Sequence, residues 1–431
     1  MDAGIEAQPV LRAGRRCFGV NLGCGEGLEL ADFFEPAGRG VQHASLRAAN
    51  RRAVLTTITF SPGISNAEVS RRTGLAPQTA SAIVTELEDD GLITRGDVLR
   101  GRRGQPATPL YLDYGGAYGI GCEISWRHLD ITLINLGSED LGRYRRDFAY
   151  PDATTILAEA AEAIAGLIAR LTPAQQQRVA GIGLATPSNL GSLIGNVDPP
   201  PGQLEAWRAL DLRSGLEAAT GLATTWFNDG NCACFAEMVM SPPPRPANLV
   251  HLFVSTYLGA GITAEHTLWE GPTGNSANLG SMLVNGHDGH RSFGHDIAST
   301  TALGRRLAEA GIELPVGNPS DWPWADWEAH IAPWVEASGS ALAEIIVNTG
   351  AVLEIDHAII DSTAPQPITE RLVAATEQAL GELVVIGARR PRLVAGTLGA
   401  RATPLGAAQL TMFRKHFSRD LSDMLAAGGG D

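Results

Sequence analysis

Apolar positions between residues 46 and 87 recur at intervals of three and four, the spacing of one face of an α-helix. Three short helices are predicted there, the first ending at Ser61-Pro62-Gly63 and the other two separated at Gly74. The apolar stripe of the first helix consists of Leu46, Ala49, Ala53, Val54 and Ile58. The stripe of the third consists of Ala80, Ile83, Val84 and Leu87.

The second and third helices are predicted to form a helix-turn-helix. Ser65 with Glu68 three residues later is a capping box, and Gly74 can end the helix in a left-handed conformation. Pro77 suits the first turn of the third helix. In a helix-turn-helix, residues at the N-terminus of the second helix contact base edges and phosphates in the major groove. The residues predicted to do so lie outside the apolar stripe: Gln78, Thr79 and Ser81.

A β-hairpin is predicted next, from two short apolar runs around Gly96 and Asp97, which is typical of the wing in a winged helix. Residues 108–113 are interpreted as a connection to the following domain. Clustered arginines at the hairpin's end favour phosphates or a narrow minor groove. The predicted contacts from the hairpin are Arg100, Arg102 and Arg103, and those from the first helix are Arg51 and Arg52.

Charge favours a DNA contact over the alternative, a helical hairpin with a solvated basic loop. Residues 47–104 carry nine arginines against six acidic residues, whereas the whole chain has a formal net charge of -14. A basic region in an acidic protein is expected of a nucleic-acid contact surface.

From residue 113 onward, strand patterns alternate with helical ones. The predicted elements of a first lobe are strands 118–124, 129–136 and 141–148, helix 154–171, strands 179–185 and 224–228, and a helix from Gly230. This order is that of one lobe of the actin-like, ribonuclease-H-like fold. A second lobe is predicted from strands 249–257 and 260–265 turning at Leu258-Gly259, helices 301–310 and 327–353, strands 358–361 and 392–395, and a helix from Thr403.

These patterns divide the 431 residues into three parts. Residues 1–44 are predicted to form a flexible arm, residues 45–112 the winged helix-turn-helix, and residues 113–431 a two-lobed domain. No apolar run reaches the roughly 18 to 20 residues of a membrane helix, so we expect a cytoplasmic protein without membrane contact. Five cysteines, an odd number, argue against a disulfide framework.

Four motifs follow one another in the two-lobed region: Gly181-Ile-Gly-Leu-Ala-Thr-Pro187, Asn228-Asp-Gly-Asn231, Gly259-Ala-Gly-Ile262, and the run from Trp269 to Gly280. Behind a winged helix, this order resembles the ROK family of bacterial sugar kinases and sugar-responsive repressors, in its repressor branch. The resemblance implies an α/β protein with an N-terminal winged helix-turn-helix. A two-lobed, actin-like ATPase or sugar-kinase fold would follow, with a ligand between its lobes.

The resemblance also implies a set of sugar-binding residues. Asn228 and Asp229 match family residues that bond sugar hydroxyls, and in the kinases this Asp is the general base. Asn278 and Ser281 replace a Glu and a His that also hold the sugar in the family. The predicted ligand-binding residues are therefore Asn228, Asp229, Asn278 and Ser281. Asp229 could also cap the helix that starts at Gly230, a compatible role.

Two departures from the family pattern argue against phosphate binding and against zinc binding. Family kinases have an Asp-x-Gly-Gly-Thr phosphate loop, whereas this chain has Glu123-Ile-Ser-Trp-Arg-His128, in which Trp126 would fill the space for phosphate. The Cys and His ligands of the family's zinc site are also missing. His287, His290 and His295 lie close together in sequence but form no recognised metal motif. We therefore predict no catalytic residues, no cofactor and no metal.

The expected function is that of a DNA-binding transcriptional regulator, a repressor, controlled by a carbohydrate or related polar metabolite. A homodimer or tetramer would bind an inverted repeat in double-stranded DNA. One alternative is an ATP-dependent sugar kinase with an appended DNA-binding domain. Another is a regulator whose lobes respond to a protein partner.

Overall fold

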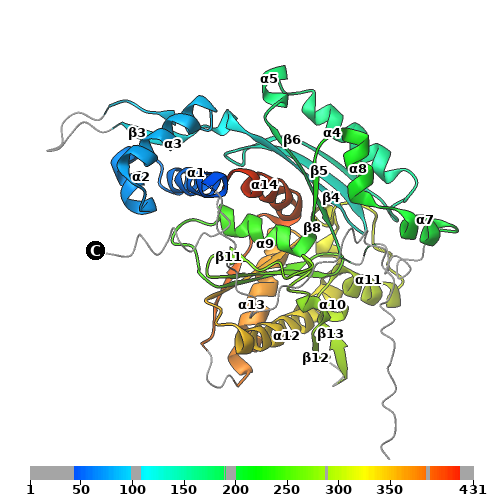
Figure 1. Cartoon of the computed structure of the whole chain (residues 1–431). Helices are drawn as coiled ribbons and strands as arrows, with labels where there is room; N and C mark the ends of the chain where they lie inside the picture. The colour runs from blue at the N-terminus through cyan, green and yellow to red at the C-terminus, as the bar shows by residue number, and fades with distance from the viewer. Residues whose placement is uncertain are drawn as a thin grey trace, which may run out of the picture.

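The computed structural model describes residues 43–98, 108–188, 190, 200–286, 290–384 and 389–417. They form a winged helix and two α/β lobes, with two helices, α9 and α14, packed between the lobes (Figure 1). Nearly all of the arm predicted for residues 1–44 lies outside this description. No helix in these described ranges is long and apolar enough to cross a membrane.

The winged helix contains three helices and a three-stranded sheet in the order β1-β3-β2. Its elements are α1 (His43–Phe60), β1 (Ile64–Ser65), α2 (Asn66–Thr73), α3 (Pro77–Asp89), β2 (Ile93–Arg95) and β3 (Pro109–Leu112). Ser65 caps α2 by accepting a hydrogen bond from the Glu68 amide, and Gly74 ends it with a left-handed φ of 68°. The Ser65 N-cap, the end at Gly74 and the buried stripe of α3 are confirmed. The capping box is only half formed, because the Glu68 side chain pairs with Arg71 and Arg72.

The predicted second strand of the wing was wrong. β2 pairs antiparallel with β3, Ile93 opposite Leu112 and Arg95 opposite Leu110, so the segment interpreted as a connection is a strand. Burial explains the difference, because Leu110 is enclosed in the core of the winged helix whereas Val98 is exposed. The stripe predicted for α1 was also too long: Leu46 and Ala49 are exposed, and full burial begins at Val54.

The first lobe is built on a five-stranded sheet in the order β6-β5-β4-β7-β8. Helices α4 and α8 cover its outer face. The elements are η1 (Tyr114–Gly116), β4 (Tyr118–Ile124), β5 (His128–Asn135), β6 (Asp140–Asp147), α4 (Ile156–Ile168), α5 (Pro173–Gln176), β7 (Val179–Thr186), α7 (Gln203–Ala209), α8 (Leu212–Thr220), β8 (Thr224–Asn228) and α9 (Asp229–Met240).

The second lobe has a similar five-stranded sheet, in the order β11-β10-β9-β14-β15, beside α12 and α13. Its first elements are β9 (Leu249–Val254), β10 (Leu258–Ala264), β11 (Thr267–Leu268), η3 (Leu279–Ser281), β12 (Leu283–Asn285), β13 (Arg291–Phe293), α10 (Gly294–Ile297) and α11 (Thr300–Glu309). The later ones are η4 (Pro319–Asp321), η5 (Trp324–Trp327), α12 (Glu328–Val352), β14 (His357–Ser362), α13 (Gln366–Glu382), β15 (Arg392–Ala395), η6 (Gly399–Arg401) and α14 (Ala402–His416). The predicted turn at Leu258-Gly259 was wrong, because both residues belong to β10 and pair with β9.

Helices α9 and α14 pack against each other between the two sheets, α14 on the first-lobe sheet and α9 on the second-lobe sheet. This close packing depends on glycine. A Cβ at Gly121 of β4 would lie 1.8 Å from the Pro404 carbonyl oxygen, and one at Gly406 of α14 would lie 1.8 Å from that of Cys232. Figure 1 shows α14 beside α1 as well, so α14 contacts the winged helix and both lobes.

Candidate DNA interface and effector site

The N-terminal turn of α3 presents the predicted base contacts to solvent. Gln78, Thr79 and Ser81, which we call the reading surface, are exposed, while the opposite side of α3 is buried in the core of the winged helix. In the part of the chain that the structure describes, none of these three side chains makes a hydrogen bond within the protein. Their donors and acceptors are therefore available to base edges or phosphates.

The predicted arginine contacts divide into two groups. Arg51 forms an ion pair with Asp90 at the end of α3, and Arg52 is half-buried. Phosphate would have to compete with Asp90 for Arg51, so the DNA role of Arg51 stays a prediction. Arg100, Arg102 and Arg103 fall in residues 99–107, outside the described residues. Sequence reasoning did not single out Arg71, whose exposed side chain lies near the end of α2 and pairs with Glu68.

The inner face of the first-lobe sheet, on which α14 packs, carries an unexpected row of polar side chains. Strand β5 alternates, with Leu129, Ile131 and Leu133 in the outer hydrophobic core. The intervening residues face inward together with side chains of β4 and β6. The polar members, here called the inner polar face, are Glu123, His128, Asp130, Thr132, Arg143 and Arg145.

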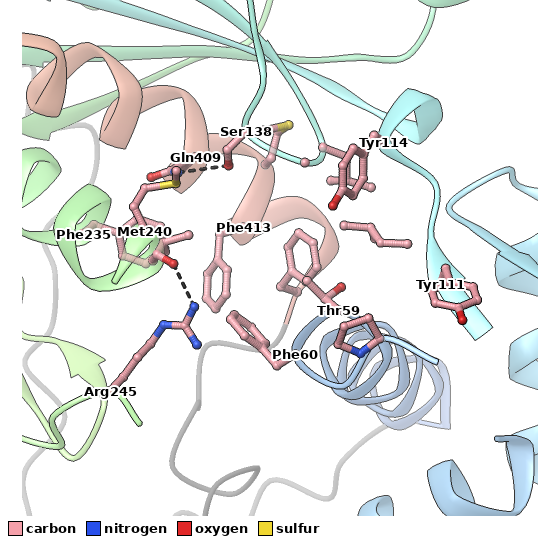
Figure 2. Close-up of a pocket in the computed structure, with 17 residues that line it drawn as sticks. Thr59, Phe60, Tyr111, Tyr114, Ser138, Phe235, Met240, Arg245, Gln409 and Phe413 are labelled. Carbon is pink, nitrogen blue, oxygen red and sulfur yellow. Dashed lines mark hydrogen bonds between the residues drawn. The ribbon is translucent and has the colours of Figure 1, made fainter. Parts of the chain in front are cut away.

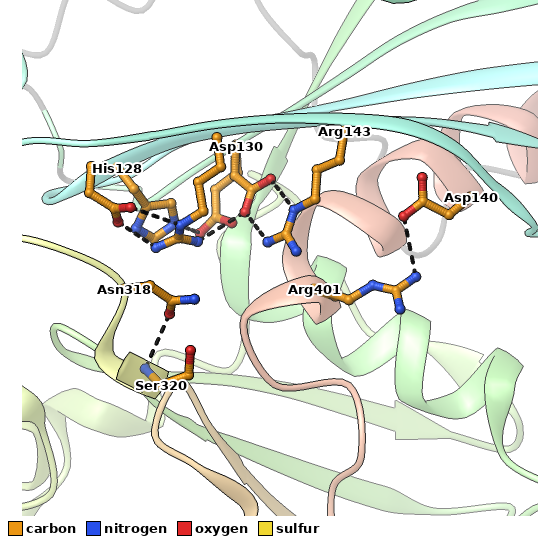
Figure 3. Close-up of polar contacts among 10 residues, drawn as sticks. His128, Asp130, Asp140, Arg143, Asn318, Ser320 and Arg401 are labelled. Atoms are coloured by element: carbon orange, nitrogen blue, oxygen red, sulfur yellow. Dashed lines mark hydrogen bonds and ion pairs between the residues drawn. The ribbon is translucent and has the colours of Figure 1, made fainter. Parts of the chain in front are cut away.

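The charges of the inner polar face are largely paired with one another (Figure 3). His128 Nε2 lies 3.2 Å from Oε1 of Glu123. Asp130, with none of its surface exposed, accepts hydrogen bonds from Arg143 Nε at 2.8 Å and Arg145 Nη1 at 2.9 Å. The alternation of polar and apolar residues along residues 128–133 was the sequence signal for this face, and our sequence reasoning did not use it.

Asn228 and Asp229 meet this face at the junction of β8 and α9. The predicted cap was wrong by one residue: Asn228 is the N-cap, accepting from the Asn231 amide at 3.1 Å, and α9 begins at Asp229. Asp229 Oδ1 accepts from the Gly230 amide at 2.8 Å. Burial, followed by the charge of Glu123, raises the pKa of Asp229 to about 6. The residue as a whole nevertheless keeps some accessible surface.

Asn278 and Ser281 lie together, because the Ser281 hydroxyl donates to Asn278 Oδ1 at 3.2 Å. Both are exposed, and η3 packs on the first residues of β10, where Gly280 approaches the Leu258 carbonyl. Gly230 packs two residues further along β10, against Ala260. The structure thus brings both predicted pairs of ligand-binding residues to the same end of β10.

Aromatic side chains fill the space at the turn between β4 and β5. Trp126 is only 4% exposed and packs edge-to-face on Tyr257 of the second lobe, with ring centroids 5.3 Å apart. Tyr257 packs in turn on His295 at 5.8 Å. Sequence reasoning placed Trp126 where phosphate would lie but missed Tyr257, whose contact depends on the meeting of two lobes.

The three histidines considered for a metal do not form a described cluster. His287 lies outside the described residues, and His295 is half-buried between the rings of Tyr257 and Phe293. Burial lowers the pKa of His295 below its ordinary value. No group of three or more His, Cys, Asp or Glu that could hold a metal occurs among the residues described.

Comparison with known families separates two parts of the chain. Residues 120–413 match the ROK family, and residues 47–94 match a winged helix-turn-helix DNA-binding family. The protein belongs to the ROK family. The family match spans both lobes with α9 and α14, and the second match covers the reading surface.

Relatives and solved structures agree with this assignment. A xylose repressor of Bacillus subtilis is 23% identical over 241 residues, which are 56% of this chain and 61% of the repressor. An uncharacterised Sinorhizobium fredii protein is 23% identical over 86% of this chain and 92% of its own length. A crystal structure of a ROK family transcriptional regulator, a homologue of the E. coli MLC protein, superposes with a TM-score of 0.65 at 22% identity, covering 89% of this chain and all of that one.

Proposed function

We propose that this ROK protein is a DNA-binding repressor whose lobes bind a carbohydrate or polyol, and that this ligand changes its affinity for DNA. The observation that carries the proposal is the reading surface: polar, exposed and without internal partners in the described chain, on a helix whose other side is buried. The names of the xylose repressor relatives support the same class of function.

The effector would contact Asn228 and Asp229 from the first lobe and Asn278 and Ser281 from the second. Amide, carboxyl and hydroxyl groups together can donate to and accept from a polyol. Because these residues come from both lobes, a ligand that bonds to all of them favours one arrangement of the lobes. Helix α14 contacts both lobes and shares a hydrophobic core with the winged helix, which gives the change a physical route to the reading surface.

An inverted-repeat operator read by a homodimer is part of the proposal. One helix-turn-helix contacts only a few base pairs, and two-fold symmetry doubles the recognised sequence. By linkage, an effector that weakens DNA binding must itself be bound more weakly by the DNA complex.

The kinase alternative has one observation in its favour, the raised pKa of Asp229, which would suit a general base. Phosphoryl transfer, however, depends mainly on holding the phosphates. Trp126 occupies the turn between β4 and β5, and a second loop is also closed to anions. There the amides of Thr397 and Leu398 donate to Glu237, and that of Gly399 donates to Asp361. We therefore propose that Asp229 binds ligand and does not act as a base.

Selection of bound sequences from a random duplex library tests the DNA half of the proposal, and fluorescence anisotropy then measures release by a panel of sugars and polyols. We expect a palindromic consensus and release by one class of ligand. Asp229→Ala should abolish release, and Asp229→Asn, which keeps one acceptor oxygen, should lose less of it. Equal affinity for all duplexes would refute the proposal. Sugar phosphorylation at an ordinary kinase rate, abolished in Asp229→Asn, would favour a bifunctional protein.

A further inference from the structure

A cavity of about 480 Å³ lies where the winged helix meets the two-lobed domain. Its walls come from α1, α9, α14, the end of β3 with the start of η1, and the turn between β5 and β6. Small-molecule sites typically measure about 300–1,000 Å³, so the volume suits a ligand. The site is separate from the four residues proposed to bind the effector, none of which lines it.

Aromatic rings from both domains surround the cavity, as Figure 2 shows. Phe60 belongs to α1 of the winged helix, Phe235 to α9 and Phe413 to α14. Phe235 and Phe413 pack edge-to-face with centroids 5.3 Å apart. Such rings favour a flat apolar body, which would contact both domains at once.

A buried amide also lines this cavity and holds one of its walls in place. Gln409 of α14 is 4% exposed, and its Nε2 donates to the Ser138 hydroxyl at 3.0 Å. Its Oε1 has no hydrogen-bond partner among the described residues. That oxygen has almost no accessible surface, so Gln409 acts as a fixed part of the cavity wall and not as a contact for a ligand.

Arg245 supplies a positive charge at the edge of the cavity. Its guanidinium donates to the carbonyls of Met238 and Val239, each at 3.0 Å, and lies 5.2 Å from the centroid of Phe60. Within the described ranges it forms no ion pair with a carboxylate. Capping the end of α9 explains part of this placement, but it does not explain the open volume beside the guanidinium.

We propose that this cavity is a second small-molecule site, for an aromatic carboxylate. The carboxylate pairs with Arg245, and the ring packs among the phenylalanines. Because α1 forms one wall and α9 and α14 another, the ligand fixes the winged helix relative to the lobes.

Binding is tested on the full chain without DNA, so failure here is distinguishable from failure of the proposed repressor function. The fluorescent probe 1-anilinonaphthalene-8-sulfonate is titrated first, then displaced by 3-(4-hydroxyphenyl)propionate or by the neutral 3-(4-hydroxyphenyl)propanol. Arg245→Gln should lower the affinity for the acid on the order of tenfold and leave the affinity for the alcohol nearly unchanged. The matched control Arg213→Gln, on exposed α8, should alter neither. Equal weakening of acid and alcohol, or an unaltered affinity for the acid, would overturn the proposal.

A second pair of variants tests the location. Met240 lines the cavity and is exposed, so Met240→Trp should fill the entrance and remove displaceable probe binding. Val352→Trp, at the exposed end of α12, should leave it intact. Probe binding that survives Met240→Trp would place the site elsewhere. Absence of displaceable binding in the unaltered chain would mean that no such ligand enters, and the proposal would be abandoned.

Discussion

The reading surface and the inner polar face both place polar side chains on otherwise apolar elements, but they differ in what completes them. Gln78 is exposed and has no internal hydrogen bond in the described chain. Asp130, in contrast, is fully buried and satisfied by two arginines. The comparison teaches that the winged helix leaves the polar groups of α3 exposed at its surface, whereas the first lobe uses its polar groups to fix its own shape.

Breaking the inner polar face should have the largest effect on stability. Asp130→Ala leaves Arg143 and Arg145 without their buried carboxylate, and we expect a loss of about 3 kcal/mol in the free energy of unfolding, measured with urea. The control is Asp140→Ala, whose exposed partner Arg401 lies 3.5 Å away and whose loss should cost less than about 0.5 kcal/mol. Similar losses in the two variants would mean that Asp130 is not a structural centre.

Asp229 is less buried than Asp130, and the titration of its carboxyl predicts a pH-dependent change in stability. Its raised pKa contributes stability that is complete below the unfolded carboxyl value of about 4 and is lost as pH rises through about 6. The free energy of unfolding of Asp229→Asn should therefore be about 1–2 kcal/mol higher than that of the wild type at pH 8, a figure reduced for partial solvent screening. The advantage should shrink at pH 5. Urea denaturation at both pH values measures it, and a difference independent of pH would contradict the shift.

Changes at the reading surface should affect DNA binding and leave the fold intact. Gln78→Ala should lose about 1–2 kcal/mol of discrimination between the operator and mismatched duplexes, with unfolding unchanged. The double variant Arg102→Ala, Arg103→Ala should instead lower the affinity for all duplexes. The slope of log affinity against log salt concentration should fall by about one unit for each phosphate that the protein no longer neutralises. Anisotropy at several salt concentrations separates the two. A loss of specificity in the arginine variant alone would assign base contacts to the wing.

Metal removal should have the smallest effect. The chain lacks the Cys and His ligands of the family's zinc site, so we expect no stoichiometric zinc and an unchanged melting temperature in EDTA. Elemental analysis and calorimetry measure both. One tightly held zinc for each chain would show that His287, His290 and His295 form a site after all.

Local patterns predicted the start of α2 and the buried face of α3, because both depend on neighbouring residues. The stripe from Ala80 to Leu87 and the cap at Ser65 depend on residues three and four positions apart. The second wing strand depends on which distant segment pairs with β2, and the hydrophobicity around Val98 gave the wrong partner. Register between distant segments is set by burial in the assembled core, which periodicity does not report.

The candidate sites show the same division. The ROK motifs predicted Asn228 and Asp229, and the structure places them beside the inner polar face. Polar and apolar residues alternate along β5, with His128, Asp130 and Thr132 as the polar ones. The sequence does not show, however, that both faces of β5 are covered. Gln409 and Arg245 carried no motif at all. They line one cavity only because α14 and the chain after α9 both pass beside the winged helix.

The position of α14 has a consequence for synthesis on the ribosome. Leu405, Ala408 and Met412 of this late helix belong to the same hydrophobic core as Val54 and Val84 of the winged helix. A nascent chain that has released residues 45–112 therefore still lacks part of that core. The helices of the winged helix pack on one another, but the contribution of α14 to this core arrives only after translation has passed residue 412, so a prematurely terminated product would lack it.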